Sequence, residues 1–302
     1  MKSLLLTVLL LFASATWAGP LEDAISAYSR KDYTTALRLL RPLAAEESGS
    51  AQYILGTMYL EGEGVVQDHA EAVNWYRLAA ANGVAAAQSR LGAMYSQGHG
   101  VLKDDSEAVK WFRLAAAQGD ATAQVILGMR YTLGIGVMKN YAEAVKWFRL
   151  AAAQGNARAQ FSLGVRYDEG EGVLQDYAEA VKWYRLAAAQ GDAIAQFNLG
   201  VKYALGQGVL QDYSEAVKWY RLAAAQGDAN AQHNLGLMYA RGDGVSQDNI
   251  RAHMWFNLAA VKGNESAVKN RDVAAKRMNS LQVGEAQRLA RECQAREFKG
   301  CN

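Results

Sequence analysis

Few side chains in this 302-residue chain have the type and spacing that catalysis or metal binding requires. No histidine stands three or four residues from another ligand in a clear cluster, the spacing that places two metal ligands on one helix face. The single Ser-x-x-Lys sequence, Ser266 to Lys269, has no Ser-Asp-Asn or Lys-Thr-Gly companion. We therefore predict a protein that is not an enzyme and holds no cofactor or metal. The histidines are His69, His99, His233 and His253.

The two cysteines, Cys293 and Cys301, are close together near the C-terminus. In an exported protein such a pair can form a disulfide. The enclosed loop is short and Cys293 is expected on a helix, so the geometry does not decide between a disulfide and a pair of free thiols.

The composition excludes several classes of protein. Hydrophobic residues make up 51% of the chain, which excludes a disordered protein, and a net charge of +2 gives no strong electrostatic case for nucleic acid. Both prolines, Pro20 and Pro42, lie near the N-terminus, so the rest of the chain can form helices without a forced break.

The first 18 residues have the pattern of a signal peptide. Lys2 precedes an apolar run from Leu4 to Phe12, and small residues follow up to Ala18, the favoured cleavage site. The run is short for a membrane span, although an uncleaved anchor is the alternative, and no later segment is apolar enough to span. We expect a protein of the Gram-negative periplasm or a secreted protein, with no transmembrane span after removal of residues 1–18.

A repeat of 36 residues organises the chain from residue 49 to residue 263. Six tryptophans are spaced 36 residues apart, and six Leu-Gly pairs and six tyrosines have the same spacing. A period of this length indicates a solenoid of stacked supersecondary units. The tryptophans that mark the repeat are Trp75, Trp111, Trp147, Trp183, Trp219 and Trp255.

One repeat, residues 156–191, predicts two helices. Asn156 is a suitable N-cap for the first helix, a loop with Gly170 and Gly172 ends it, and Asp176 opens the second helix as the start of a capping box. Gly191 ends the second helix. Large residues face small ones, so we expect the Trp183 indole to fill the space that the Leu-Gly and Ala-Ala pairs leave.

This pattern resembles the Sel-1-like repeat family, which is related to tetratricopeptide repeats. The matching residues in the fourth repeat are Ala159-Gln, Leu163-Gly, Tyr167, Gly170-x-Gly172-Val, Asp176, Ala180, Trp183, Ala187-Ala188 and Gly191. The resemblance implies an all-α, right-handed superhelical solenoid of helix pairs. Some cysteine-rich secreted members have been discussed as penicillin-binding or β-lactam-hydrolysing, but this chain lacks their paired cysteines.

Both ends depart from the repeat. Residues 19–48 lack the Gly-x-Gly loop and the Trp, and resemble a shorter tetratricopeptide-like capping unit. Residues 264–302 predict two polar-faced capping helices and a tail, because a terminal repeat must present a solvated outer face.

The first helices of a curved solenoid are expected to line its concave side. Three columns of variable residues lie there: Met58, Met94, Arg130, Arg166, Lys202 and Met238; Ile54, Arg90, Ile126, Ser162, Asn198 and Asn234; and Arg158, Ile194 and Asn230. Arginine suits partners that carry carboxylates, and methionine suits adaptable contacts. The hypothesis is that six of these residues contact a partner: Arg130, Arg158, Arg166, Asn198, Lys202 and Asn234.

These observations favour an exported scaffold that binds an unidentified protein or peptide partner. The alternative is a cell-wall protein that binds or hydrolyses peptidoglycan, β-lactams or polysaccharide. Self-association is a third possibility, and the sequence indicates no nucleic-acid partner.

Overall fold

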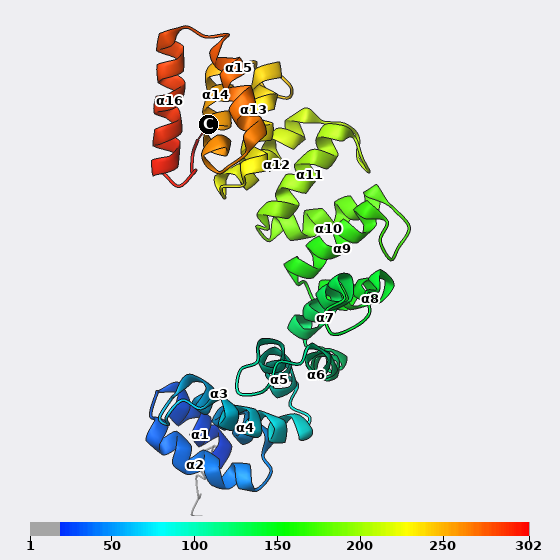
Figure 1. Ribbon diagram of the computed structural model, residues 1–302, viewed down its shortest axis with the longest axis vertical. Helices are drawn as coiled ribbons and strands as arrows, with labels where there is room; N and C mark the ends of the chain where they lie inside the picture. The colour runs from blue at the N-terminus through cyan, green and yellow to red at the C-terminus, as the bar shows by residue number, and fades with distance from the viewer. Residues whose placement is uncertain (1–18, 302) are drawn as a thin grey trace, which may run out of the picture. The chain divides into compact units, whose positions relative to one another are not determined.

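The computed structural model describes residues 19–301, so the predicted signal peptide lies outside the described part. Every regular element in residues 19–301 is a helix, and the chain order follows the colour bar of Figure 1. The first pair is α1 (Pro20–Ser29) and α2 (Tyr33–Ala45), and the last two helices are α15 (Glu265–Ala275) and α16 (Ser280–Ala295).

Six helix pairs lie between these ends, at the 36-residue period of the sequence. Their first helices are α3 (Gly49–Glu61), α5 (Ala85–Gln97), α7 (Ala121–Leu133), α9 (Ala157–Glu169), α11 (Ala193–Leu205) and α13 (Ala229–Arg241). Their second helices are α4 (His69–Ala81), α6 (Asp105–Ala117), α8 (Tyr141–Ala153), α10 (Tyr177–Ala189), α12 (Tyr213–Ala225) and α14 (Asn249–Val261). The expected all-α solenoid of helix pairs is confirmed. No helix in residues 19–301 is both long enough and apolar enough to cross a membrane.

Local signals set the ends of these helices, although the predicted capping box at Asp176 is only half formed, because the Glu179 side chain pairs with Lys182. The Asn156 side chain accepts a hydrogen bond from the Ala159 N–H at the start of α9, and the Asp176 side chain accepts from the Glu179 N–H at the start of α10. Gly170 ends α9 with a φ of +70°. Gly172 has a φ of +76°, and a Cβ there would lie 2.4 Å from the backbone of Tyr141, so this loop packs directly on the start of α8.

The core confirms the packing of large residues against small ones but corrects the residue that does it. In five of the repeats the residue after the Trp, and not the Trp itself, lies on the helical glycine: a Cβ at Gly164 would be 2.7 Å from the Tyr184 ring. Tyr184 is 1% exposed, whereas Trp183 remains partly exposed. Rotating one position along a helix moves a side chain by about 100°, which separates these two neighbours. The expectation that the Trp183 indole fills this space was therefore wrong.

A row of buried glutamines links successive helix pairs. Gln160 donates from Nε2 to the Ala152 carbonyl at 3.3 Å and accepts at Oε1 from Gln190 Nε2 at 2.8 Å. Gln190 also donates to the Gly155 carbonyl at 2.9 Å. The same bonds recur around Gln124 and Gln196. Each buried amide thus joins a helix pair to the one before it.

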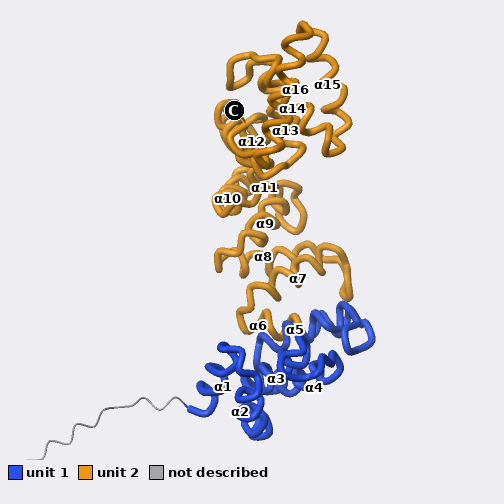
Figure 2. Tube along the Cα trace, turned by 90° about the vertical axis from the view of Figure 1, so that its left-hand side faces the viewer, with its two compact units in different colours: residues 1–111 blue, residues 112–302 orange. Residues whose placement is uncertain are grey.

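The chain divides into two compact units, residues 1–111 and residues 112–302, coloured separately in Figure 2. The described part of the first unit has one core around Leu40 and Leu55 and another around Tyr76 and Leu91. The second unit contains the cores of the later pairs, the last of which extends from α12 to α16. The residues considered below as a site all belong to the second unit.

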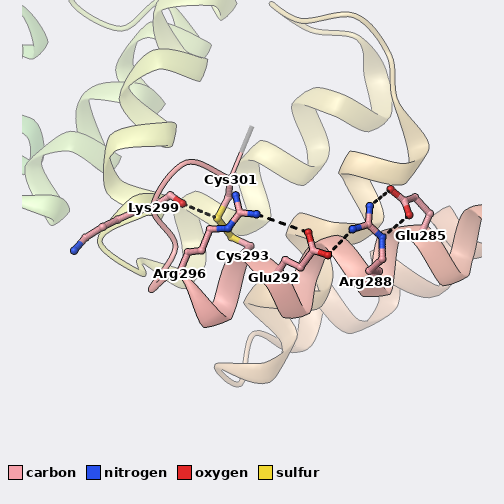
Figure 3. Close-up of polar contacts among 7 residues, drawn as sticks. All are labelled: Glu285, Arg288, Glu292, Cys293, Arg296, Lys299 and Cys301. Atoms are coloured by element: carbon pink, nitrogen blue, oxygen red, sulfur yellow. Dashed lines mark hydrogen bonds and ion pairs between the residues drawn. A yellow bond between two sulfur atoms is a disulfide. The ribbon is translucent and has the colours of Figure 1, made fainter.

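The two C-terminal cysteines, which the sequence left open, are joined in a disulfide with their Cα atoms 5.3 Å apart. Cys293 is on the buried face of α16, and Cys301 is in the tail that folds back on it (Figure 3). Ion pairs run along the exposed face of the same helix, with Arg288 between Glu285 and Glu292. The bridge therefore ties the last residues of the described chain to α16.

Candidate partner-binding groove

The predicted cationic column occupies a different environment from the one expected. Its members point between helix pairs, and most are buried: Met58, Met94, Arg130, Lys202 and Met238 are all less than 9% exposed. The Arg166 side chain is 11% exposed. The expectation of an open cationic stripe is corrected on this point, because this face of each first helix packs against the preceding pair.

Lys202 shows how a buried cation is accommodated here. Its ammonium group pairs with Asp168 of the preceding pair, donates to Gln207 Oε1 at 2.9 Å and lies 4.6 Å from the centre of the Tyr177 ring. Tyr184 donates to the other oxygen of Asp168 at 3.2 Å. Burial, followed by the negative charge of Asp168, raises the pKa of Tyr184, so its hydroxyl remains a donor. This cluster holds two helix pairs together.

The two arginines of the column have similar surroundings. The Arg130 guanidinium lies 5.3 Å from the centre of the Phe112 ring, and the Arg166 guanidinium lies 5.1 Å from that of Tyr141. Arg166 also pairs with Glu171 and, at 3.2 Å, with Glu169. These contacts give both arginines a structural role whatever else they bind.

The predicted asparagines are half-buried, each beside a tyrosine of the preceding repeat. Asn198 forms a hydrogen bond with Tyr184, and Asn234 forms one with Tyr220. Burial raises the pKa of Tyr220 to about 12. Each amide therefore has an internal partner and lies on the face that adjoins the core.

Arg158 is the one predicted arginine that is largely exposed, and it borders a groove between α7 and α9. One hollow of the groove, of about 340 Å³, lies at the start of these helices; another, of about 170 Å³, lies further along them, and both have Met129 in their wall. The first is lined by Thr122, Val125, Ile126, Met129, Asn156 and Arg158. The second is lined by Met129, Thr132, Leu133, Phe148, Phe161, Ser162, Val165 and Arg166.

The groove suits an apolar side chain or a short extended segment. Its walls are mainly aliphatic and aromatic, and Leu133 is 61% exposed at one end. Arg158 lies at the opposite end, and neither a hydrogen bond nor an ion pair links its guanidinium to another residue in the described chain. The groove thus combines an apolar surface with a cation at its rim, a common composition for binding sites.

The structure brings Arg158 and Arg166 together in this groove with Ile126 and Ser162 of the second variable column. Asn198, Lys202 and Asn234 lie on later helices, and Arg130 is packed on Phe112. The sequence analysis missed Met129, Leu133 and Phe161. Their variation between repeats was visible, but exposure depends on the neighbouring pair.

The histidines have no arrangement suited to a metal. Within residues 19–301, no three His, Cys, Asp or Glu side chains lie close enough to share a metal ion. His253 is 3% exposed, and burial lowers its pKa. His233 lies 2.9 Å from the Asn270 amide nitrogen. Both belong to the packing of the last pairs.

Comparisons with known proteins agree with the helix-pair architecture. The family model described as Sel1 repeat matches six consecutive segments: 49–84, 85–120, 121–156, 157–192, 193–228 and 229–264. The crystal structure of a Sel1 repeat protein from Oxalobacter formigenes is 37% identical, with a TM-score of 0.73 over 80% of this chain and 98% of that one. No curated protein matches the chain.

Another similar structure is c5321, a protective antigen of uropathogenic Escherichia coli strains with an SLR fold. It is 27% identical, with a TM-score of 0.40, over 92% of this chain and 78% of that one. A putative Sel1 repeat protein from Klebsiella pneumoniae subsp. pneumoniae is 22% identical, with a TM-score of 0.42, over 67% of this chain and 99% of that one.

Proposed function

Because this chain belongs to the Sel1 repeat family, we propose that it is an exported, non-enzymatic scaffold that binds a protein or peptide partner in the groove between α7 and α9. Proteins built from Sel1 repeats are generally protein–protein interaction scaffolds. Stacked helix pairs present extended surfaces suited to such partners. The observation that carries the proposal is the apolar groove with Arg158 at its rim.

Of the six residues predicted to contact the partner, Arg158 and Arg166 line this groove. Arg158 contributes a free charge, whereas Arg166 is paired and shapes the wall. Asn198 and Asn234 would be reached only by a partner that extends along α11 and α13. Arg130 and Lys202 act through the packing of the helices that carry the site.

Site-specific photo-crosslinking in cells tests the groove. A photoreactive residue at Thr122, which is exposed and lines the groove, is expected to trap a partner. The same residue at Lys146, exposed on α8 outside the groove, is the matched control. Purified partner should then bind Arg158→Glu about tenfold more weakly and Lys146→Glu with unchanged affinity. Equal crosslinking at both positions would exclude the groove as the binding site.

Export is a separate part of the proposal, supported by the signal-like residues 1–18 and the Cys293–Cys301 disulfide. Sequencing the N-terminus of the protein from an envelope fraction should find Gly19 first. A cytosolic protein that retains Met1 would contradict export. Hydrolysis of a chromogenic β-lactam by the purified protein would contradict the non-enzymatic assignment and favour the cell-wall alternative.

A further inference from the structure

A further hollow, of about 190 Å³, lies between α13, α14 and α15 at the C-terminal end of the second unit. It occupies the same position in the repeat as the hollow beside Met129, three repeats further along, with Phe256 in the place of Phe148. Its lining residues are Leu237, Ala240, Arg241, Asn249, Phe256, Asn270, Val273, Ala274 and Arg277.

The residues that differ between these two hollows make the lining of the C-terminal hollow more positively charged. Arg241 stands where the earlier repeat has Leu133, and Arg277 stands where it has Glu169. Asn249 replaces Tyr141, whose ring packs on Arg166 in the earlier repeat. An apolar hollow with an internally paired arginine thus becomes a hollow with two arginines and amides.

Neither new arginine is neutralised within the described chain. The guanidinium groups of Arg241 and Arg277 make no hydrogen bond or ion pair with another residue of 19–301. The described residues that line the hollow include no Asp or Glu. Arg241 is the last residue of α13, and Arg277 follows the end of α15, where a helix dipole favours a cation. Two unpaired guanidiniums facing one hollow are electrostatically complementary to an oxyanion.

A further group in the wall lacks a partner. The amide oxygen of Asn249 is buried and accepts no hydrogen bond from the described residues. Because solvent does not reach this oxygen, it makes the wall polar but offers no contact to a peptide backbone. Asn270, by contrast, is held by His233 at 2.9 Å.

We propose that this hollow binds an acidic side chain of a peptide partner, with Arg241 and Arg277 pairing its carboxylate and Leu237, Phe256 and Val273 packing on the apolar residue beside it. The inference rests on the proposed scaffold function and gives its partner a chemical character. A peptide that carries a carboxylate next to an apolar residue fits the mixed lining better than a free inorganic anion.

Titration of the purified protein with two matched peptides tests this assignment. The probes are acetyl-Ala-Leu-Glu-Leu-Ala-amide and its Gln counterpart, followed through the side-chain Nε–H NMR signals of the arginines. The Glu peptide should move the signals of Arg241 and Arg277 and bind about tenfold more tightly than the Gln peptide. Arg241→Gln and Arg277→Gln should each remove most of this preference.

Arg291→Gln is the control, because Arg291 is exposed on α16 and does not line the hollow. Equal binding of the two peptides, or an equal loss in Arg291→Gln, would overturn the assignment. So would inorganic phosphate moving both arginine signals while the Glu peptide does not.

The two proposals fail separately. If Thr122 crosslinks a partner but the Glu peptide leaves Arg241 and Arg277 unmoved, the C-terminal assignment is wrong and the groove stands. If the arginine signals move and Thr122 traps nothing, the α7/α9 groove is wrong and the acidic-peptide site stands.

Discussion

At the scale of single residues, the helical glycine of the third repeat, Gly128, allows an aromatic ring to pack closely on its helix. A Cβ at Gly128 would lie 2.4 Å from Phe148 Cε1. We expect Gly128→Ala to lower the free energy of unfolding by about 1–3 kcal/mol, because the clash outweighs the gain of about 1 kcal/mol in helix propensity. Urea unfolding measures the change.

Gly284→Ala is the matched control for that substitution. Gly284 is inside α16, and nothing lies within 4 Å of the position of its Cβ. Only the helix propensity should then act, and the variant should gain up to about 1 kcal/mol. Stabilisation by both substitutions would contradict the packing role of Gly128.

The buried charge of Lys202 gives a second residue-scale prediction. Lys202→Met leaves the Asp168 carboxylate, whose side chain is 20% exposed, without its cation. We expect a loss of about 1–3 kcal/mol in the free energy of unfolding. Lys218→Met removes a lysine that is 65% exposed, and because solvent screens its pair with Glu215 we expect little change in the free energy of unfolding. Similar losses in the two variants would show that Lys202 is not structurally paired.

At the scale of elements, Glu63 connects the loop after α3 with the first helix pair. Its carboxylate accepts from the Tyr28 hydroxyl at 2.5 Å and from the Tyr33 hydroxyl at 2.7 Å. These two hydrogen bonds, with Tyr28 the larger cause, lower the pKa of Glu63. The contact thus contributes stability above the unfolded pKa of about 4.3 and loses it as the pH falls through the lower folded value.

Amide protection factors in α1 and α2 measure this dependence. They should fall below about pH 4 in the unmodified protein. Glu63→Gln should have lower protection at pH 6 and a flatter profile, because its amide does not titrate. Profiles of the same shape in the two proteins would assign the acid sensitivity to other carboxylates.

At the scale of the whole molecule, the C-terminal helices cover an apolar surface that a solenoid would otherwise leave open. Leu258 on α14 is 3% exposed, whereas Leu222, at the same position of the preceding repeat, is 49% exposed. Helix α16 packs on α14 and makes the difference. Capping elements of this kind keep repeat proteins soluble.

Deletion of residues 265–302 should therefore raise the fraction of the protein that self-associates, because Leu258 and Trp255 become exposed. Light scattering at matched concentrations, with the full chain as control, measures the change. An unchanged mass distribution would mean that α15 and α16 are not needed as a cap.

The sequence by itself determined the repeat, the helix pairs and their ends. These features depend on local signals, such as the Asp176 N-cap and Gly170, which act within a few residues of each helix end. Because the repeat recurs every 36 residues, the prediction made for one repeat applies to all six. The resemblance to Sel1 repeats is carried by the same residues, so the family was also readable from the sequence.

Tertiary structure decided which side chains are free to bind. Arg130, Arg158 and Lys202 are all cations on first helices, yet only Arg158 is exposed in a groove, because the other two reach the preceding helix pair. The aromatic residues on the helical glycines and the hollow at Arg241 and Arg277 likewise depend on neighbouring pairs. Exposure is set by contacts between residues far apart in the chain, which helix periodicity alone does not specify.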